Sequence, residues 1–171
     1  MSLNINYIVM IMSSEYYHYL KTEYQDEWSK KDLFFIDKSF MIAFLSDFNS
    51  SLKLGACIVL NKKKYYTGYN QKCRTQIFNS KYYSLHAEIH ALSNFIKCEY
   101  GQYDLCNWSA ANNNSTIYIV RLMNNPMFPP YGISKPCKRC ESFLYQHNIK
   151  YIKYTDIDDY GKQVLVTLQR N

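Results

Sequence analysis

The sequence predicts a three-layer α/β/α sandwich built on a five-stranded mixed sheet. Its 171 residues are 47% hydrophobic, which suits one compact domain with a sizeable core. From the helix expected at residues 33–48 onward, predicted helices and strands follow the order α-β-β-α-β-α-β-β, and such alternation is typical of helices packed on a sheet. Only residues 155–161 separate the last two strands, whereas a parallel crossover needs a dozen or more residues. We therefore expect these two strands to pair antiparallel.

The elements predicted in the first half are two helices, a β-hairpin and a third helix, at residues 14–31, 33–48, 55–60 with 65–69, and 85–97. Apolar side chains recur at helical spacing in the three helical segments. The hairpin is predicted because a buried-strand pattern and a tyrosine-rich run flank a polar turn. We expect residues 1–38 to form a helical extension and residues 39–171 to form the main domain.

The second half predicts a strand, a helix and two further strands, at residues 116–122, 135–146, 149–154 and 163–168. A polar loop covers residues 99–114. Three prolines fall within residues 124–134, and we expect no regular structure there.

The net charge of +6 is unevenly distributed along the chain. Residues 1–38 carry a net charge of −2, and residues 39–171 carry +8. No acidic residue occurs between Asp47 and Glu88, and seven basic residues alternate there with aromatic ones. Cations hold phosphates and aromatic rings stack on bases, so this interval favours an anionic substrate. A solvated basic face with tyrosines in the core explains it equally well, and A/T-rich codons could produce the same composition.

Nothing in the sequence predicts a membrane segment. No apolar run approaches the roughly 20 residues that a membrane span needs. The apolar patch at residues 7–12 is short, and no basic segment precedes it, which argues against a signal peptide. We expect an intracellular protein, cytoplasmic or nuclear.

Two short motifs stand at predicted helix starts and carry the chemistry. Cys137 and Cys140 form a Cys-x-x-Cys motif, and free N–H groups at a helix N-terminus favour the thiolates that a metal needs. His86, from the start of the neighbouring helix, would complete three protein ligands and leave a fourth position for water, as in a catalytic zinc site. Glu88 lies two residues from His86, where it could exchange protons without being a ligand.

Other interpretations of these residues fit less well. A redox Cys-x-x-Cys needs a thioredoxin-like context that is missing here. Disulfides among the six cysteines conflict with an intracellular chain. His86 and His90 have zincin-like spacing, but a zincin has glutamate where Ala87 stands. We interpret His90 as a histidine of the helix surface or core.

The two motifs resemble the signature of the zinc-dependent nucleoside and nucleobase deaminases, His-x-Glu followed by Pro-Cys-x-x-Cys. The matching residues are His86-Ala87-Glu88 and Pro136-Cys137-Lys138-Arg139-Cys140. The resemblance covers about residues 40–169, since the element order also fits, and Gly55-Ala56 and Gly68-Tyr69-Asn70 resemble family positions. It implies a cytidine deaminase-like fold of the type that ends in a β-hairpin.

The resemblance implies that His86, Cys137 and Cys140 bind Zn²⁺ and that Glu88 is the catalytic proton shuttle. Water activated by zinc would attack C4 of cytosine and give uracil and ammonia. The resemblance further implies substrate contacts, which we assign to Asn70, Lys72, Ala87 and Pro136. A turn residue after a strand explains Asn70 as well as a sugar contact does.

Two departures from the family pattern bear on the substrate. Hairpin-type cytidine deaminases usually have Asn-x-Glu where this chain has Asn70-Gln71-Lys72, and lysine pairs with phosphate but accepts no hydroxyl proton. The interval between Glu88 and Pro136 is longer than in compact members of the family, and residues 126–133 are a candidate substrate lid.

Three functions are compatible with the sequence. The first is a zinc-dependent hydrolytic deaminase of cytosine in a cytidine or deoxycytidine nucleoside or nucleotide, as in nucleotide metabolism. The second is a cytosine deaminase that edits single-stranded RNA or DNA, which the basic-aromatic interval favours. The third is a non-enzymatic structural or accessory protein, against which the intact catalytic set argues. We expect an enzyme and place the first function slightly ahead; a homo-oligomer stays open.

Overall fold

The computed structural model describes residues 28–49, 52–60, 64–73, 75–77, 80–100, 115–123 and 131–169. The three described helices are α2 (Lys30–Ala43), α3 (Ala87–Tyr100) and α4 (Lys138–Gln146). The strands are β1 (Leu54–Leu60), β2 (Lys64–Tyr69), β3 (Thr75–Ile77), β4 (Ser80–Tyr82), β5 (Thr116–Leu122), β6 (Tyr131–Gly132), β7 (Tyr151–Ile157) and β8 (Gln163–Gln169).

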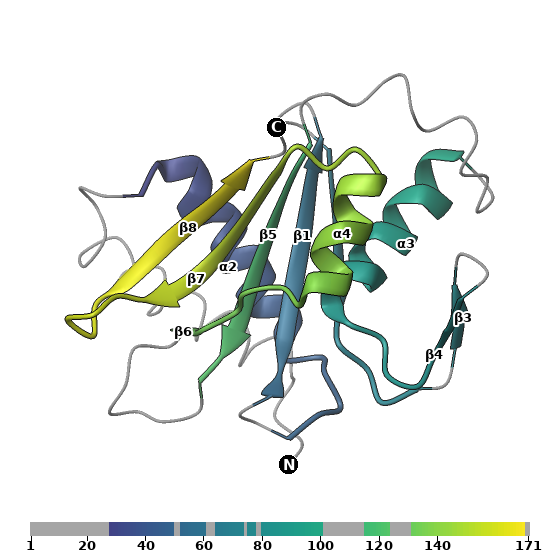
Figure 1. The fold of residues 1–171 in the computed structure, drawn as a ribbon, viewed down its shortest axis with the longest axis horizontal. Coiled ribbons are helices and arrows are strands. Elements are labelled where there is room, and N and C mark those ends of the chain that lie inside the picture. The colour runs from purple at the N-terminus through teal and green to yellow at the C-terminus, as the bar shows by residue number, and fades with distance from the viewer. Residues whose placement is uncertain are drawn as a thin grey trace, which may run out of the picture.

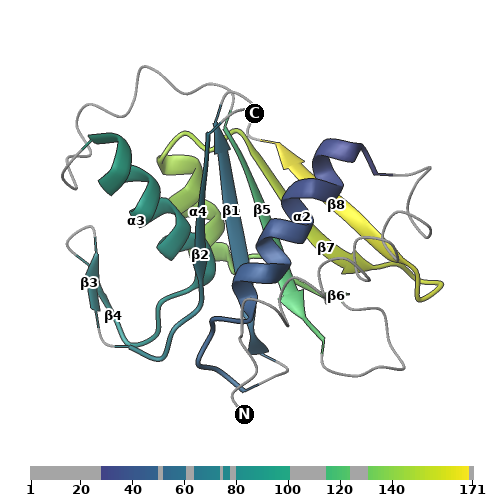
Figure 2. The same cartoon turned by 180° about the vertical axis from the view of Figure 1, so that it is seen from behind.

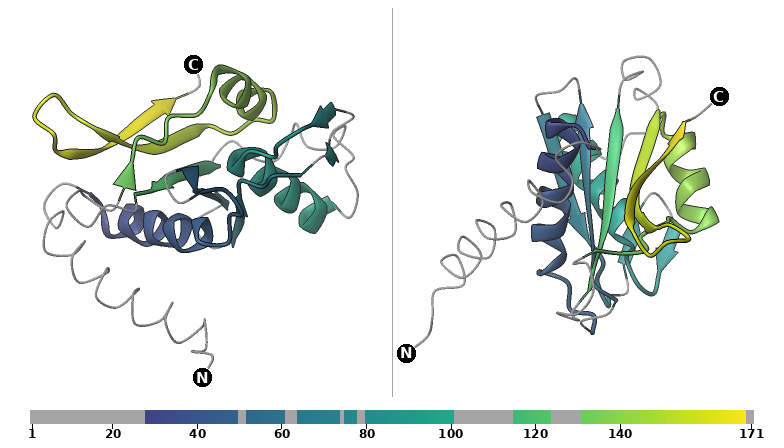
Figure 3. Two further views of the ribbon diagram at one scale, coloured as in Figure 1. Left: turned by 90° about the horizontal axis from the view of Figure 1, so that it is seen from below. Right: turned by 90° about the vertical axis from the view of Figure 1, so that its left-hand side faces the viewer.

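The predicted three-layer sandwich is confirmed. The central sheet has the strand order β2-β1-β5-β7-β8, with α3 and α4 in front of it in Figure 1 and α2 behind it, as Figure 2 shows. Figure 3 gives the edge-on view, in which α2 and α4 lie on opposite sides of the sheet. The sheet has six strands rather than the predicted five, because the two-residue β6 pairs with β5.

Side chains that alternate along β1 and β5 separate two hydrophobic cores. Ala56 and Ile58 face the core beneath α3 and α4, whereas Cys57 and Val59 face the core beneath α2. Successive side chains of a strand point to opposite faces, so a strand covered on both faces is apolar throughout. The continuous apolar runs that predicted these strands are thus the consequence of helices on both sides.

The predicted first hairpin is confirmed, and two glycines let helices approach it closely. β1 and β2 pair antiparallel from Gly55 opposite Tyr69 to Leu60 opposite Lys64. A Cβ atom on Gly55 would lie 1.9 Å from the backbone oxygen of Ser39 in α2. A Cβ atom on Gly68 would lie 2.2 Å from the backbone nitrogen of Ala91 in α3. Both helices therefore rest directly on the backbone of the hairpin.

The order of the last three strands places the start of α4 near the start of α3. β5 and β7 pair parallel, and α4 forms the crossover between them. β7 and β8 then pair antiparallel along their full length, as the short connection between them predicts. The result is a mixed sheet in which α3 and α4 pack on the same face and contact each other.

Helix α2 begins and ends earlier than the prediction of residues 33–48. Ser29 caps it, because its Oγ accepts a hydrogen bond of 3.1 Å from the backbone N–H of Asp32. The domain boundary predicted after residue 38 falls inside this helix, and Leu33 and Phe40 on either side share one core. The extension of residues 1–38 stays a prediction, and most of the predicted helix 14–31 lies outside the described residues.

Short strands were missed by the sequence analysis. β3 and β4 form a separate two-stranded sheet between β2 and α3. β6 lies within the segment that was expected to lack regular structure, so that expectation is wrong at Tyr131 and Gly132. Tyr131 is buried against Trp28 and Phe40, which excludes it from a mobile lid. Of the rest of the candidate lid, Gly132 pairs with Arg121 of β5, Ile133 is exposed, and residues 126–130 lie outside the described residues.

Candidate active site

Both predicted motifs lie at helix starts. His86 immediately precedes α3, and Glu88 occupies the first turn of that helix. Cys137 is the N-cap of α4, where its Sγ accepts a hydrogen bond of 3.5 Å from the backbone N–H of Cys140. The helix predicted over residues 135–146 begins later, at Lys138, because Pro136 disfavours helical backbone in the residue before it and Cys137 adopts extended backbone as the cap.

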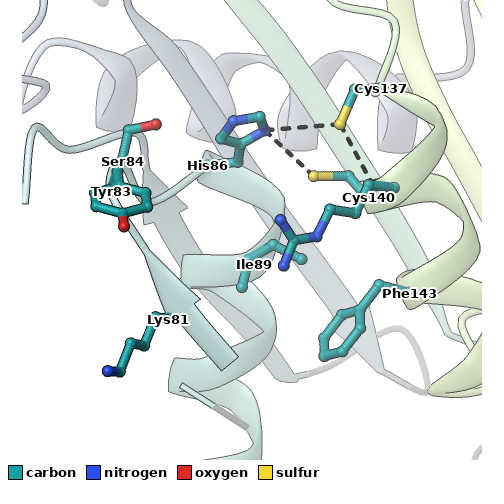
Figure 4. A pocket seen from close by; sticks show the side chains of 9 residues that line it. Lys81, Tyr83, Ser84, His86, Ile89, Cys137, Cys140 and Phe143 are labelled. Carbon is teal, nitrogen blue, oxygen red and sulfur yellow. Dashed lines mark hydrogen bonds between the residues drawn. The ribbon is translucent and has the colours of Figure 1, made fainter. Parts of the chain in front are cut away.

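The structure brings His86, Cys137 and Cys140 into one group whose ligand atoms all lie within 4.8 Å of one another. The Nδ1 atom of His86 lies 3.3 Å from Sγ of Cys140 and 3.9 Å from Sγ of Cys137. Tetrahedral zinc with ordinary bond lengths separates nitrogen and sulfur ligands by about 3.6 Å. The two distances bracket this value, so the three side chains fit a zinc ion, and Figure 4 shows His86 facing both cysteines.

The surroundings of Cys140 disfavour a thiolate unless a cation lies beside its sulfur. Burial, reinforced by the charge of Glu88 and by Cys137, raises the pKa of the Cys140 thiol above its usual value. A metal ligand must be the thiolate, so metal binding here releases a proton. The other described cysteines, Cys57, Cys73 and Cys98, lie outside the metal group.

Glu88 is a buried carboxyl beside the metal group. It is only 3% exposed. Burial raises the pKa of Glu88, while a backbone hydrogen bond and the charge of His86 oppose that rise. A carboxyl group whose pKa is raised towards neutrality can both accept and donate a proton, as a general acid–base catalyst must. This chemistry matches the role predicted for Glu88.

Two cavities adjoin the metal group from different sides. The first, of about 260 Å³, is lined by Glu88, Asn70 and the apolar side chains of Phe48, Leu52 and Leu54. The second, of about 270 Å³, is lined by Lys81, Tyr83, Ile89, Arg139 and Phe143, and Figure 4 shows most of these residues. Ser84, His86 and Cys137 line both cavities.

The predicted substrate residues fall into two groups. Asn70 and Ala87 line the first cavity. Asn70 also clamps the start of β1: its Nδ2 donates to the backbone oxygen of Leu52 at 2.7 Å, and its Oδ1 accepts from the backbone N–H of Leu54 at 2.8 Å. Lys72 and Pro136 are absent from the described residues that line either cavity.

The positions of Lys72 and Pro136 explain their absence. The Nζ atom of Lys72 lies 5.4 Å from the ring centroid of Phe48, a residue that lines the first cavity. Pro136 is buried next to Cys137. Lys135 lines the first cavity instead. The site prediction did not include this lysine, although it lies in the basic segment around Pro136.

His90 is not part of the metal group, as its interpretation as a helix histidine predicted. Its Nδ1 lies 3.2 Å from the backbone nitrogen and 3.0 Å from the backbone oxygen of Tyr69. The ring of His90 also packs edge-on against that of Tyr69. His90 therefore ties α3 to the end of β2, next to Asn70.

A family model described as the cytidine and deoxycytidylate deaminase zinc-binding region matches residues 29–155. The chain belongs to this family. As in the rest of this deaminase family, zinc is its cofactor, and the His/Cys/Cys group is the set of described side chains that could hold the ion. No protein with a curated description matches the chain.

The fold is similar to that of a solved deaminase structure. The dCMP deaminase of cyanophage S-TIM5, in its apo form, is 18% identical with a TM-score of 0.50, over 77% of this chain and 87% of that one. A cytidine deaminase from Burkholderia pseudomallei is 16% identical with a TM-score of 0.49, over 79% of this chain and 89% of that one. No helix among the described residues is long and apolar enough to span a membrane.

Proposed function

We propose that this deaminase hydrolyses cytosine to uracil and ammonia in a cytidine or deoxycytidine nucleoside or nucleotide. The observation that carries the proposal is the buried carboxyl of Glu88 in a small cavity that His86 and Cys137 also line. A carboxyl group isolated from water next to three metal-ligating side chains has no evident structural use. It suits a hydrolysis in which protons must be moved at the reacting ring.

His86, Cys137 and Cys140 hold the zinc ion in this proposal. Zinc, when bound, polarises a water molecule so that it becomes a nucleophile near neutral pH. The N-terminal position of Cys137 supports the assignment, because the backbone N–H of Cys140 already donates to its sulfur. A backbone hydrogen bond of this kind helps to keep a ligand sulfur negatively charged and correctly oriented.

Glu88 moves the protons. It accepts one from the attacking water and delivers it to N3 of the pyrimidine. It then takes a second proton from the hydroxyl group formed at C4 and gives it to the amine, which leaves as ammonia while C4 becomes a carbonyl. Its raised pKa supports both directions of transfer, since the neutral and charged forms then lie closer in free energy. Its burial keeps bulk water from competing for these protons.

The first cavity orients the substrate. Phe48, Leu52 and Leu54 supply an apolar wall for a flat ring. Asn70 has spare hydrogen-bonding capacity beyond its two backbone bonds, since an amide offers two N–H donors and two acceptor lone pairs. We assign it to the sugar, Ala87 to the base, and Lys135 rather than Lys72 or Pro136 to the phosphate of a nucleotide.

The test compares zinc-loaded wild-type protein with the Glu88→Gln variant, on cytidine, deoxycytidine and dCMP. Uracil release should fall by about 10²–10⁴-fold in the variant, which is the usual contribution of a general acid–base group. Zinc content should stay at the wild-type value, because Glu88 is not among the ligands. The matched control is Glu99→Gln, at the far end of the same helix, which should keep full activity.

Each outcome of this test is informative. Full activity of Glu88→Gln refutes the assignment of the proton shuttle. No uracil from zinc-bound wild-type protein on these three substrates refutes a nucleoside or nucleotide substrate. No uracil from single-stranded oligonucleotides either refutes the enzymatic function and favours a structural or accessory role. We also propose an intracellular location, because none of the five described cysteines forms a disulfide, which is usual in a reducing compartment.

A further inference from the structure

The second cavity is distinct from the space in which Glu88 lies, but the two cavities share part of their walls. Glu88 lines only the first cavity, whereas Ser84, His86 and Cys137 line both. A molecule with its reactive ring beside Glu88 would therefore reach the second cavity by extending past Ser84. The proposed deamination reaction does not require this second space.

The charges of the second cavity suit phosphate. Lys81 and Arg139 line it, and no aspartate or glutamate is among the described lining residues. The two cations come from different elements, since Lys81 lies in β4 and Arg139 lies in α4. The second cavity therefore receives positive charge from two separate parts of the fold. An arrangement of this kind attracts a phosphodiester backbone.

The aromatic side chains suit a nucleobase. Tyr83 exposes 81% of its surface, and Phe143 lines the same cavity. An exposed ring beside cations is the usual platform on which an unpaired base stacks. The cavity of about 270 Å³ is also as large as the catalytic one, which is more space than a single phosphate needs. Each cavity alone lies just below the usual range of ligand pockets, about 300–1,000 Å³.

We propose that the second cavity binds the nucleotide adjacent to the target cytosine, so that the substrate class is a single-stranded oligonucleotide. This inference rests on the proposed deaminase function and names its substrate. The shared wall of Ser84, His86 and Cys137 favours a nucleotide that is covalently linked to the target over an independent one. Lys81 and Arg139 contact its phosphodiester, and Tyr83 stacks on its base.

Binding is measured in the zinc-loaded Glu88→Gln background, in which turnover should be about 10²–10⁴-fold slower than in the wild type. The probes are dCMP and the pentanucleotide TTCTT, with the corresponding ribonucleotides UUCUU and CMP as a second arm. The pentanucleotide should bind at least tenfold more tightly than the mononucleotide in one of the arms, since one stacked base contributes about 5–150-fold. Its affinity should also fall with added salt.

The variant Lys81→Gln/Tyr83→Ala should reduce the ratio of pentanucleotide to mononucleotide affinity about tenfold. Lys97→Gln is the matched control, because it removes one exposed positive charge about 15 Å along α3 from the start of that helix. This variant should preserve the ratio of the two affinities. Equal affinities for the two probes in both arms, or an unchanged ratio in the double variant, would overturn the proposal. A second bound equivalent of mononucleotide that the double variant loses also overturns it, in favour of an independent nucleotide site.

The two proposals fail in different ways. If wild-type protein releases no uracil from any substrate, the deaminase function is refuted. The ratio of pentanucleotide to mononucleotide affinity does not depend on turnover, so it tests the second cavity separately. Conversely, uracil release from dCMP with no preference for the pentanucleotide leaves the deaminase function intact and refutes the role of the second cavity.

Discussion

Replacing Gly68 by alanine should displace the helix that carries half of the active site. The added Cβ would lie 2.2 Å from the backbone nitrogen of Ala91 and 2.7 Å from the backbone oxygen of Ala87. Ordinary contact begins near 3.4 Å, so α3 and β2 must separate by about 1.2 Å. Because the obstructing atoms are backbone, no side chain can rotate away to relieve the clash.

The displacement should affect both stability and the site. Overpacking of this kind lowers the free energy of unfolding by about 1–3 kcal/mol. A shift of about 1 Å in catalytic groups can lower activity about 10²-fold, and His86 and Glu88 move with α3. We expect weaker zinc retention in chelator competition, a lower kcat/KM for deamination, and a lower midpoint in urea denaturation.

Gly161→Ala is the control for Gly68→Ala. Gly161 has a φ of +79° and lies in the turn between β7 and β8, with no atom within 4 Å of a Cβ built there. Alanine in that backbone conformation costs about 1–2 kcal/mol, a similar loss of stability without displacement of a helix. Zinc retention and kcat/KM should therefore match the wild type. Wild-type zinc retention in Gly68→Ala would refute the reasoning.

Three further predictions concern stability. Burial acts to raise the pKa of Asp32, but hydrogen bonds led by that from Lys153 outweigh it and hold this pKa below its usual value. Asp32→Asn should thus lower the free energy of unfolding at pH 7 by about 1.5–3 kcal/mol. This deficit should shrink as pH falls below about 4, because the aspartate of the unfolded chain protonates there whereas the native carboxylate protonates only at lower pH. Ser134→Ala removes a buried hydroxyl that bonds Ile119 and Thr155, and should cost about 1–3 kcal/mol in urea denaturation. Removal of zinc by a chelator should lower Tm, and added zinc should restore it.

Each of these has an outcome that would contradict it. For Asp32→Asn, a deficit that is equal at pH 7 and pH 3 would mean that the carboxylate charge contributes nothing. For Ser134→Ala, an unchanged urea midpoint would show that the buried bonds are replaced. For zinc, a Tm that is insensitive to the chelator while zinc leaves the protein would separate the metal from folding.

The strands were predictable because two helix layers cover the sheet. β5 was predicted with the bounds that the structure gives it, since a strand buried on both faces is a continuous apolar run. β3 and β6 were not predicted, because strands of two or three residues contain too few positions for any periodicity.

The metal group was predictable from spacing, whereas the cavity walls were not. Cys137 and Cys140 share a helix start, so their spacing fixes their relative position, and the family resemblance adds His86. Lys135 and Ser84 line the site from loops, whose paths no pattern in the sequence determines. Lys72, which was predicted to contact the substrate, is not among the described residues that line the two cavities.

The His86–Cys137 contact joins residues 51 positions apart, which orders events during synthesis of the chain. β1, β2 and α3 form a local unit that emerges from the ribosome complete with His86 and Glu88. The two sulfurs are synthesised only with α4, after β1, β2, α3 and β5. The complete group of three ligand side chains therefore exists only late in synthesis, after His86 and Glu88 have been made. Nascent chains that stop short of Cys140 would lack at least one of the three ligands.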